Sequence, residues 1–164
     1  AASDVYKRQE IHCLVILDYE TGKTARYNDT GASEPILTGV KDLMYADTII
    51  GHNIIGFDIP VLQECYPFFE PQGRIVDTLL LSRLYHPDML EIDRKRKVEG
   101  MPTKLYGRHS LESYGHRLGE YKGNFGQTSN WLHWSKEMED YCEQDTIVTR
   151  KLCQHFHPYL IGSN

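Results

Sequence analysis

The chain is short of positive charge. It has 164 residues, with 18 Lys and Arg against 23 Asp and Glu, which gives a net charge of -5 at pH 7. Proteins that hold nucleic acid by bulk electrostatics need clustered basic residues to neutralise phosphate. The charge balance therefore argues against such a protein, but it allows an enzyme that grips phosphate through bound metal.

Cysteine is scarce and long apolar runs are absent. The four cysteines include no C-x-x-C pair and no ligand spacing with the histidines, so no zinc site is expected. Cys13 and Cys153 lie in apolar patterns and are expected to be small core residues. No apolar run reaches the ~20 residues that span a bilayer, and no secretory signal is visible. A soluble cytoplasmic protein is expected, in the host cytoplasm if a phage encodes it.

The chain does contain a regular succession of strand and helix patterns, in a length that suits one domain. Segments 11–17 and 24–27 predict a β-hairpin around a turn that contains Gly22. Beyond the hairpin, strands are predicted at 48–51 and 75–76, and helices from 59, at 79–84, at 110–118 and from Ser135 to Pro158. This mixture predicts an α/β fold.

Two short segments carry the candidate chemistry. Segment 53–58 (NIIGFD) follows an apolar run and opens an apolar helix, so Asp58 is expected where a strand ends and a helix begins. Segment 141–145 (YCEQD) lies inside a helical pattern, and a spacing of four places Tyr141 and Asp145 on one helix face. A phenol hydroxyl and a carboxylate aimed at one point suit water held beside a cation. The two segments together are typical of half a metal site.

These segments resemble the second and third motifs, NxxxFD and YxxxD, of the DEDDy 3′-to-5′ exonucleases, a branch of the ribonuclease H-like superfamily. Segments 76–84 (VDTLLLSRL) and 109–120 (HSLESYGHRLGE) lie between them and are similar, in the same order, to the proofreading domain of phage family A DNA polymerases. The resemblance covers roughly residues 11–157. It implies a ribonuclease H-like mixed sheet flanked by helices, a single-stranded DNA 3′ end as substrate, and a polymerase domain in the full-length protein.

The resemblance also implies a role for each site residue. The reaction would be hydrolysis of 3′-terminal phosphodiesters with two divalent cations, Mg²⁺ or Mn²⁺. Asp145 would hold the ion that carries the nucleophilic water, Tyr141 would orient that water, and Asp58 would serve the ion on the leaving-group side. Asn53 and Phe57 would line the cleft for the terminal nucleotides.

Each of these residues also has a purely structural interpretation. Asp58 could cap the helix that follows it, and Asp145 could be a surface carboxylate. Tyr141 and Phe57 could be core aromatics, and Asn53 could be a turn former. Four matching segments in the same order favour the site over these alternatives.

Two further features stay open. Asp77 fits a helix cap as well as a supporting role beside the metals. The basic run Arg94–Lys97, followed by Lys104 and Arg108, lies in a stretch predicted as a loop. It suits contact with a DNA backbone or a solvated loop equally well.

The resemblance has one departure, at the start of the chain. The family's first motif, an Asp-x-Glu on the central first strand, should precede segment 11–17, and no such pair is there. Residues 1–9 back-translate without a gap as gca gcg tca gat gtg tat aag aga cag, the adapter of a transposon-based sequencing library. We therefore expect residues 1–9 to be a scar and residues 10–164 to be an incomplete exonuclease domain; the alternative is a genuine N-terminal arm.

The missing motif bears on activity. Two divalent ions carry four positive charges, and Asp58 and Asp145 would supply only half of the matching carboxylates. With the first strand missing or replaced, this chain is expected to bind metal weakly and to cleave slowly. The alternative functions are a non-catalytic module that binds single-stranded DNA or braces a polymerase, and a related 3′-to-5′ exoribonuclease.

Overall fold

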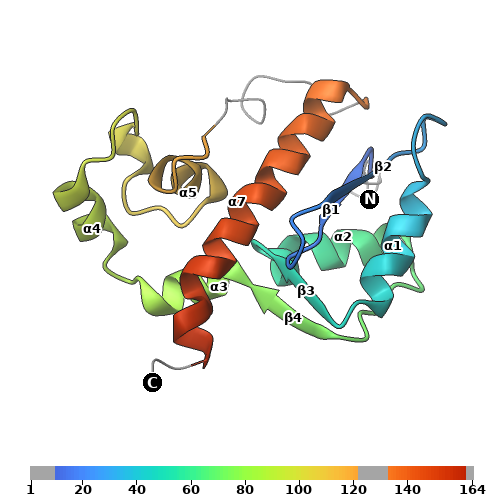
Figure 1. Cartoon of the computed structure of the whole chain (residues 1–164), viewed down its shortest axis with the longest axis horizontal. Helices are drawn as coiled ribbons and strands as arrows, with labels where there is room; N and C mark the ends of the chain where they lie inside the picture. The colour runs from blue at the N-terminus through green and yellow to red at the C-terminus, as the bar shows by residue number, and fades with distance from the viewer. Residues whose placement is uncertain (1–9, 122–132, 162–164) are drawn as a thin grey trace, which may run out of the picture.

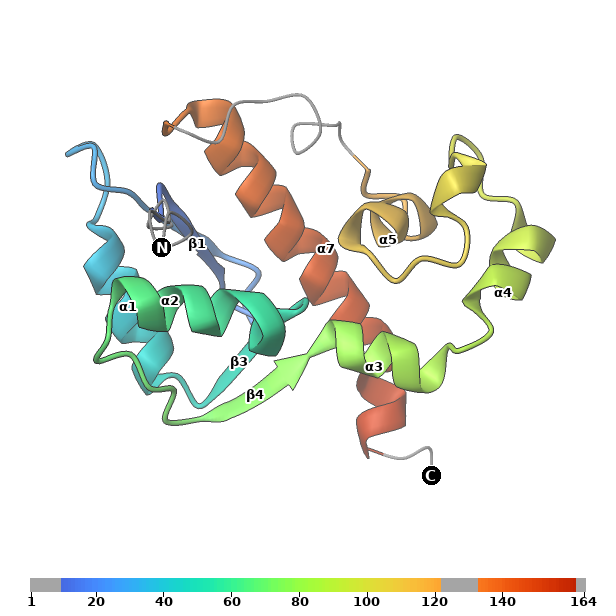
Figure 2. The same ribbon diagram turned by 180° about the vertical axis from the view of Figure 1, so that it is seen from behind.

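The fold is mixed α/β, as the sequence predicts. The computed structural model describes residues 10–121 and 133–161, so the predicted scar at 1–9 lies outside the described residues. The elements are β1 (Leu14–Leu17), β2 (Thr24–Tyr27), α1 (Ile36–Tyr45), β3 (Thr48–Gly51), η2 (Ile54–Asp58), α2 (Ile59–Cys65), β4 (Arg74–Asp77), α3 (Thr78–Tyr85), α4 (Met89–Arg96), η3 (Thr103–Leu105), α5 (Leu111–Arg117) and α7 (Lys136–Ile161). Helix α7 runs diagonally through the middle, with the strands, α1 and α2 on one side and α4 and α5 on the other (Figures 1 and 2).

The four strands form two small sheets. β1 and β2 pair antiparallel, which confirms the predicted hairpin, and β3 pairs parallel with β4 so that Gly51 lies opposite Asp77. The single mixed sheet that the sequence predicts is not found in the described residues, where no ladder joins the two pairs. In the described residues β1 pairs only with β2, and β3 pairs only with β4. Helix α7 packs on both β1 and β3 and so connects the two sheets through side-chain packing in place of a strand.

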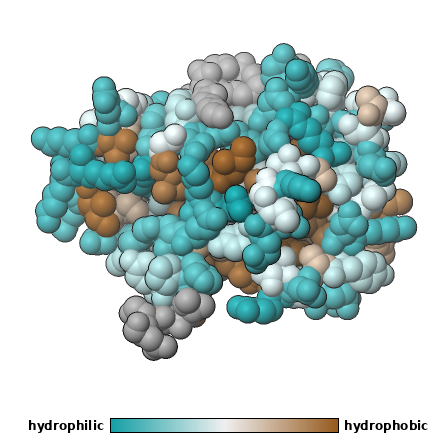
Figure 3. Space-filling model, in the orientation of Figure 1, coloured by the Kyte–Doolittle hydropathy of each residue, from teal (hydrophilic) through white to brown (hydrophobic). Residues whose placement is uncertain are grey.

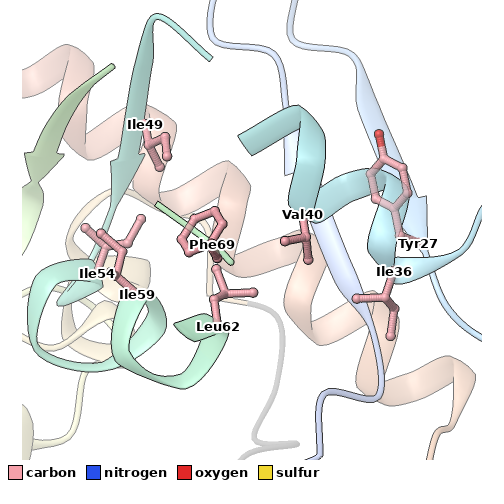
Figure 4. Close-up of a cluster of buried hydrophobic side chains, with 8 residues drawn as sticks. All are labelled: Tyr27, Ile36, Val40, Ile49, Ile54, Ile59, Leu62 and Phe69. Atoms are coloured by element: carbon pink, nitrogen blue, oxygen red, sulfur yellow. The ribbon is translucent and has the colours of Figure 1, made fainter. Parts of the chain in front are cut away.

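One hydrophobic cluster fixes the strand side of the molecule. It lies between the hairpin, α1, β3 and α2 (Figure 4), and its buried members are Tyr27, Ile36, Val40, Ile49, Ile54, Ile59, Leu62 and Phe69. Ile54 and Ile59 belong to the segment that carries the candidate site and its continuation into α2. Their burial, worth about 1.5–3 kcal/mol for each side chain, therefore holds that segment against the core.

A second cluster packs α4 and α5 against α7. Its buried members are Met89, Tyr114, Val148, Leu152 and Phe156. Beside it, Asp93 of α4 accepts two hydrogen bonds from Arg117 of α5, at 2.9 and 2.7 Å, and one from the backbone N–H of Gly107 at 2.8 Å. Asp93 and Arg117 are both buried, so this ion pair fixes how the two helices meet.

The basic run was predicted in a loop, and this prediction is wrong. Residues up to Arg96 form the last turns of α4, and Lys97 ends the helix in the left-handed conformation with φ of 49°. Arg and Lys are good helix formers, and Asp93 anchors the opposite face of this helix through its ion pair. The basic side chains of the run are exposed.

The ends of the later helices match the sequence prediction in part. The helix predicted at 110–118 is confirmed as α5: Ser110 caps it by accepting from the N–H of Ser113 at 3.2 Å, and Gly119 follows it with φ of 73°. Ser135 caps α7 through the N–H of Met138 at 3.1 Å. The predicted stop at Pro158 is wrong, because α7 continues to Ile161. Proline there removes a single hydrogen bond close to the helix end.

None of the helices in the described ranges has both the length and the apolar character needed to cross a membrane.

Candidate active site

Segment 53–58 forms an unusual turn where β3 ends. Asn53 is left-handed, with φ of 58° and ψ of 30°, and a π-helical turn from Ile54 to Asp58 follows directly. Asn tolerates the left-handed region better than most residues. A Cβ at Gly56 would lie 2.6 Å from Oδ1 of Asn53, so a larger residue there would displace the Asn53 side chain. Asn53 is thus a turn former, as its structural interpretation predicted. The π-helical turn that follows it is a rare conformation, and where such turns occur they often lie at functional sites.

Asp77 holds this turn in place from the end of the neighbouring strand. Its buried carboxylate accepts hydrogen bonds from the backbone N–H of Asn53 at 2.9 Å, of Ile55 at 3.2 Å and of Leu79 at 2.9 Å. The last of these caps α3. Asp77 therefore caps α3, one of the two roles that the sequence left open for it, and it also holds the turn that carries Asp58. Three N–H donors occupy its oxygens, so we do not count it among the candidate metal ligands.

Asp58 does not cap α2. Its side chain makes no capping hydrogen bond, and its φ of −65° and ψ of −44° are helical, so the structural interpretation of this residue is wrong. The residue as a whole is exposed, but the surrounding protein still removes part of the water around its carboxylate. Dehydration by the surrounding protein, and secondly the charge of Asp77, raise the pKa of Asp58 to about 6. Asp58 thus carries a carboxylate that the turn itself does not need.

Phe57 is 53% exposed, so its interpretation as a core residue is also wrong. Ile55, two residues earlier in the same turn, is 49% exposed. Hydrophobic residues form only small separate groups on the mainly hydrophilic face shown in Figure 3. An exposed aromatic ring offers a face on which a nucleic-acid base can stack.

Helix α7 supplies the second half of the site. Asp145 is half-buried, and dehydration followed by repulsion from Asp58 raises the pKa of Asp145 to about 7. Tyr141 is also half-buried; dehydration and then the charge of Asp145 raise the pKa of Tyr141 to about 12. The structure therefore brings Asp58, Tyr141 and Asp145 into one electrostatic neighbourhood, although 83 positions separate Asp58 from Tyr141.

Among the residues that the structure describes, no basic side chain compensates the negative charge at this point. In the described ranges no ion pair reaches Asp58 or Asp145. Hard carboxylate oxygens are ligands that suit Mg²⁺ or Mn²⁺, so the chemistry of the pair fits a divalent cation. Among the described residues no group of three or more His, Cys, Asp or Glu side chains is arranged to hold a metal ion. The donor set that can be described is thus two carboxylates.

An acidic face of α7 positions the helix, and the sequence prediction missed it. Arg26 of β2 pairs with Asp140 at 2.9 Å, with Glu139 at 3.4 Å and with Glu143. Asn28 donates to the buried Glu139 at 2.9 Å. The sequence contains a signal for this face, because Glu139, Asp140 and Glu143 are one and four positions apart and so lie close together on a helix.

His52, directly before the turn, is a second residue that the sequence prediction missed. Its Nδ1 lies 2.8 Å from Oγ1 of Thr78, and its Nε2 lies 2.7 Å from the carbonyl oxygen of His109. Burial lowers the pKa of His52. A neutral imidazole therefore ties the end of β3 to α3 and to the segment before α5. Nearby, Glu112 of α5 adds to the negative field at Tyr141.

The chain is related in sequence to DNA-directed DNA polymerases. It is 31% identical to that of Escherichia phage T7 over 169 aligned positions, which cover 88% of this chain, and 31% identical to that of Enterobacteria phage T3 over 172 positions, which cover 90%. The aligned part is 24% of each polymerase, so the chain spans about a quarter of the length of these curated relatives. No protein-family model matches the chain.

Proposed function

We propose that the chain is the 3′-to-5′ proofreading exonuclease region of a DNA polymerase, with a ribonuclease H-like arrangement of its elements. The observation that carries the proposal is the pair of carboxylates, Asp58 from the π-helical turn and Asp145 from α7, to which no ion pair within the described residues extends, with Tyr141 one helical turn from Asp145. The relation to phage DNA polymerases supports DNA as the substrate and a polymerase as the context.

The residues divide the proposed chemistry among them. A bound divalent cation would lower the pKa of the attacking water and stabilise the leaving 3′ oxygen. Asp145 and Asp58 would hold it. Tyr141 keeps its proton at neutral pH because its pKa is raised to about 12, so it would orient the water by hydrogen bonding and would not act as a base.

The terminal nucleotides would meet the exposed side of the turn. Phe57 offers its ring for stacking, which is worth about 1–3 kcal/mol for each base. Asn53, which is also exposed, would line the same cleft. The buried Asp77 would hold the turn that carries both residues, through the N–H groups of Asn53 and Ile55, without touching the substrate.

The described carboxylates limit the rate that this site can reach. Two divalent ions carry four positive charges, and Asp58 and Asp145 balance half of them. Mg²⁺ also demands near-octahedral ligation and gives up its water reluctantly. We propose weak metal binding and slow cleavage by this chain, with residues 10–164 as the exonuclease region.

The test is the shortening of a 5′-labelled single strand by the chain in Mg²⁺ or Mn²⁺, with chelator as the blank. The expected result is slow removal of 3′-terminal mononucleotides that requires the metal and falls by about 10- to 100-fold in Asp145→Asn. Asp88→Asn is the matched control, because Asp88 precedes α4 without a side-chain capping bond. Shortening that survives chelation, or an equal loss in Asp88→Asn, would refute the assignment.

A second candidate function is a module that binds single-stranded DNA or braces a polymerase without catalysis. The observation in its favour is that the described donor set ends at two carboxylates. Fluorescence anisotropy with a labelled strand separates the two functions: binding without any shortening in excess Mn²⁺ selects the module. Faster shortening of an RNA strand than of a DNA strand would select an exoribonuclease.

A further inference from the structure

Two of the four cysteines meet across the fold. Cys13 lies just before β1, Cys142 lies in the second turn of α7, and their Sγ atoms are 3.6 Å apart although the residues are 129 positions apart in sequence. Both residues are half-buried. Cys153, by contrast, is buried further along α7, as the sequence predicts, and Cys65 lies at the end of α2. Cys13 and Cys153 were both expected in the core, and of these two Cys13 is the more exposed to solvent.

The separation of the two sulfurs is short enough for a covalent bond to form with small movements. A disulfide has an S–S distance of about 2.05 Å, so the sulfurs must approach by roughly 1.5 Å. Cysteine has a single side-chain torsion that moves its sulfur. Both partners are attached to elements that are already packed together, since β1 and α7 are in contact. Folding has therefore already brought the two segments together, and forming the disulfide requires no further ordering of the backbone.

The environment also distinguishes the two thiols. The hydrogen bond that joins the two sulfurs lowers the pKa of Cys13 by more than burial raises it. The thiolate is the nucleophile in disulfide exchange. Cys13 is thus the thiol that attacks an incoming disulfide first, and Cys142 is placed to resolve the product.

We infer that Cys13 and Cys142 form a redox-responsive disulfide site whose oxidant is a low-molecular-weight disulfide such as oxidised glutathione. The Cys13 thiolate attacks one glutathione sulfur, the glutathione S–S bond breaks, and one glutathione thiolate leaves. The Cys142 thiolate then attacks the Cys13 sulfur, and the second glutathione leaves as thiolate. Two protein thiols are oxidised to one disulfide, and one oxidised glutathione is reduced to two glutathione molecules.

Closing this bond would join α7 to the segment before β1 at the residue adjacent to Tyr141. The inference does not depend on the proposed nuclease function, because the bond is detected by mass. It would, however, make the position of Tyr141 and Asp145 sensitive to the thiol–disulfide balance of the solution.

The experiment incubates the whole chain with oxidised glutathione, blocks remaining thiols, and maps peptides by mass spectrometry without reduction. The expected product is a cross-linked peptide that contains Cys13 and Cys142, with two thiols lost for each chain, a higher thermal midpoint, and full reversal by dithiothreitol. Cys65→Ser, the control, should form the same cross-link. Cys142→Ser should stop at a glutathione adduct on Cys13.

Three outcomes would overturn the inference. One is wild-type protein in which Cys13 and Cys142 are each blocked or glutathionylated separately under conditions that oxidise accessible thiols. Another is cross-linking of Cys13 to Cys65 or Cys153 as often as to Cys142. The third is that Cys142→Ser forms the glutathione adduct on Cys13 no faster than an unfolded peptide that contains Cys13. Wild-type mapping decides the matter on its own if a serine variant fails to fold.

Discussion

Replacing Asp77 by Ala tests whether one buried carboxylate organises the candidate site. The change removes the α3 cap, worth about 0.5–2 kcal/mol, and leaves the N–H groups of Asn53 and Ile55 without their acceptor. Asn53 and Ile55 are exposed, so water replaces part of the loss, and each donor should cost about 0.5–1.5 kcal/mol. The free energy of unfolding should therefore fall by about 1.5–5 kcal/mol.

Urea denaturation followed by far-UV circular dichroism measures this loss, and the midpoint should shift without a change in slope. The matched control is Asp88→Ala, at the N-cap of α4, where the side chain makes no capping hydrogen bond and the change should stay within about 0.5 kcal/mol. Asp77→Asn should lower the free energy of unfolding by an amount between those of Asp77→Ala and Asp88→Ala, because the amide oxygen can still accept a hydrogen bond. Equal losses for Asp77→Ala and Asp88→Ala would refute the assigned role of Asp77.

Three other changes test separate parts of the structure. Folding raises the pKa of Asp145 to about 7, so the folded state binds more protons than the unfolded state between about pH 4 and pH 7. The free energy of unfolding should therefore fall as the pH rises across that window. Asp145→Asn should have a higher thermal midpoint than wild type near pH 8 but not near pH 4. Gly73→Ala would place a Cβ 2.2 Å from two backbone carbonyls and should lower stability by about 1–3 kcal/mol in urea, whereas Gly115→Ala, with contacts of 3.5 Å or more, should not. Arg117→Met leaves the Asp93 carboxylate buried and unpaired and should cost about 3–5 kcal/mol, so a loss below about 1 kcal/mol would contradict the role of this pair.

Local signals in the sequence were enough for the elements that form from neighbouring residues. The hairpin, the strand at 48–51, and the caps at Ser110 and Ser135 follow from alternation, turn residues and side-chain oxygens, which act over a few positions. The placement of Asp58 and Asp145 near each other rested on resemblance, because no local signal joins positions so far apart. The effect of Asp58 on the pKa of Asp145 is a property of the folded chain alone.

The missed features have tertiary causes. The basic run became part of α4 because Asp93, on the same helix, pairs with Arg117 of α5, a contact that no window around the run contains. Phe57, for which a core position was only the structural alternative, is exposed because the π-helical turn rotates it away from the core that Ile54 and Ile59 enter. Asp58, for which capping was likewise only the alternative, does not cap α2, and the turn gives it helical dihedral angles.

The packing of the hairpin on α7 bears on how the chain is synthesised. Contacts between the two join residues 113 to 131 positions apart, as in the pairs of Arg26 with Glu139 and of Tyr19 with Arg150. At about 5–20 residues per second, a ribosome needs roughly 6 to 26 seconds to add the residues between them. During that interval β1 has emerged without its partner helix, and its apolar face is open to nonspecific association. Folding of this chain should therefore be slow and late, and it should gain more from a holding chaperone than the folding of a helical protein built from local contacts.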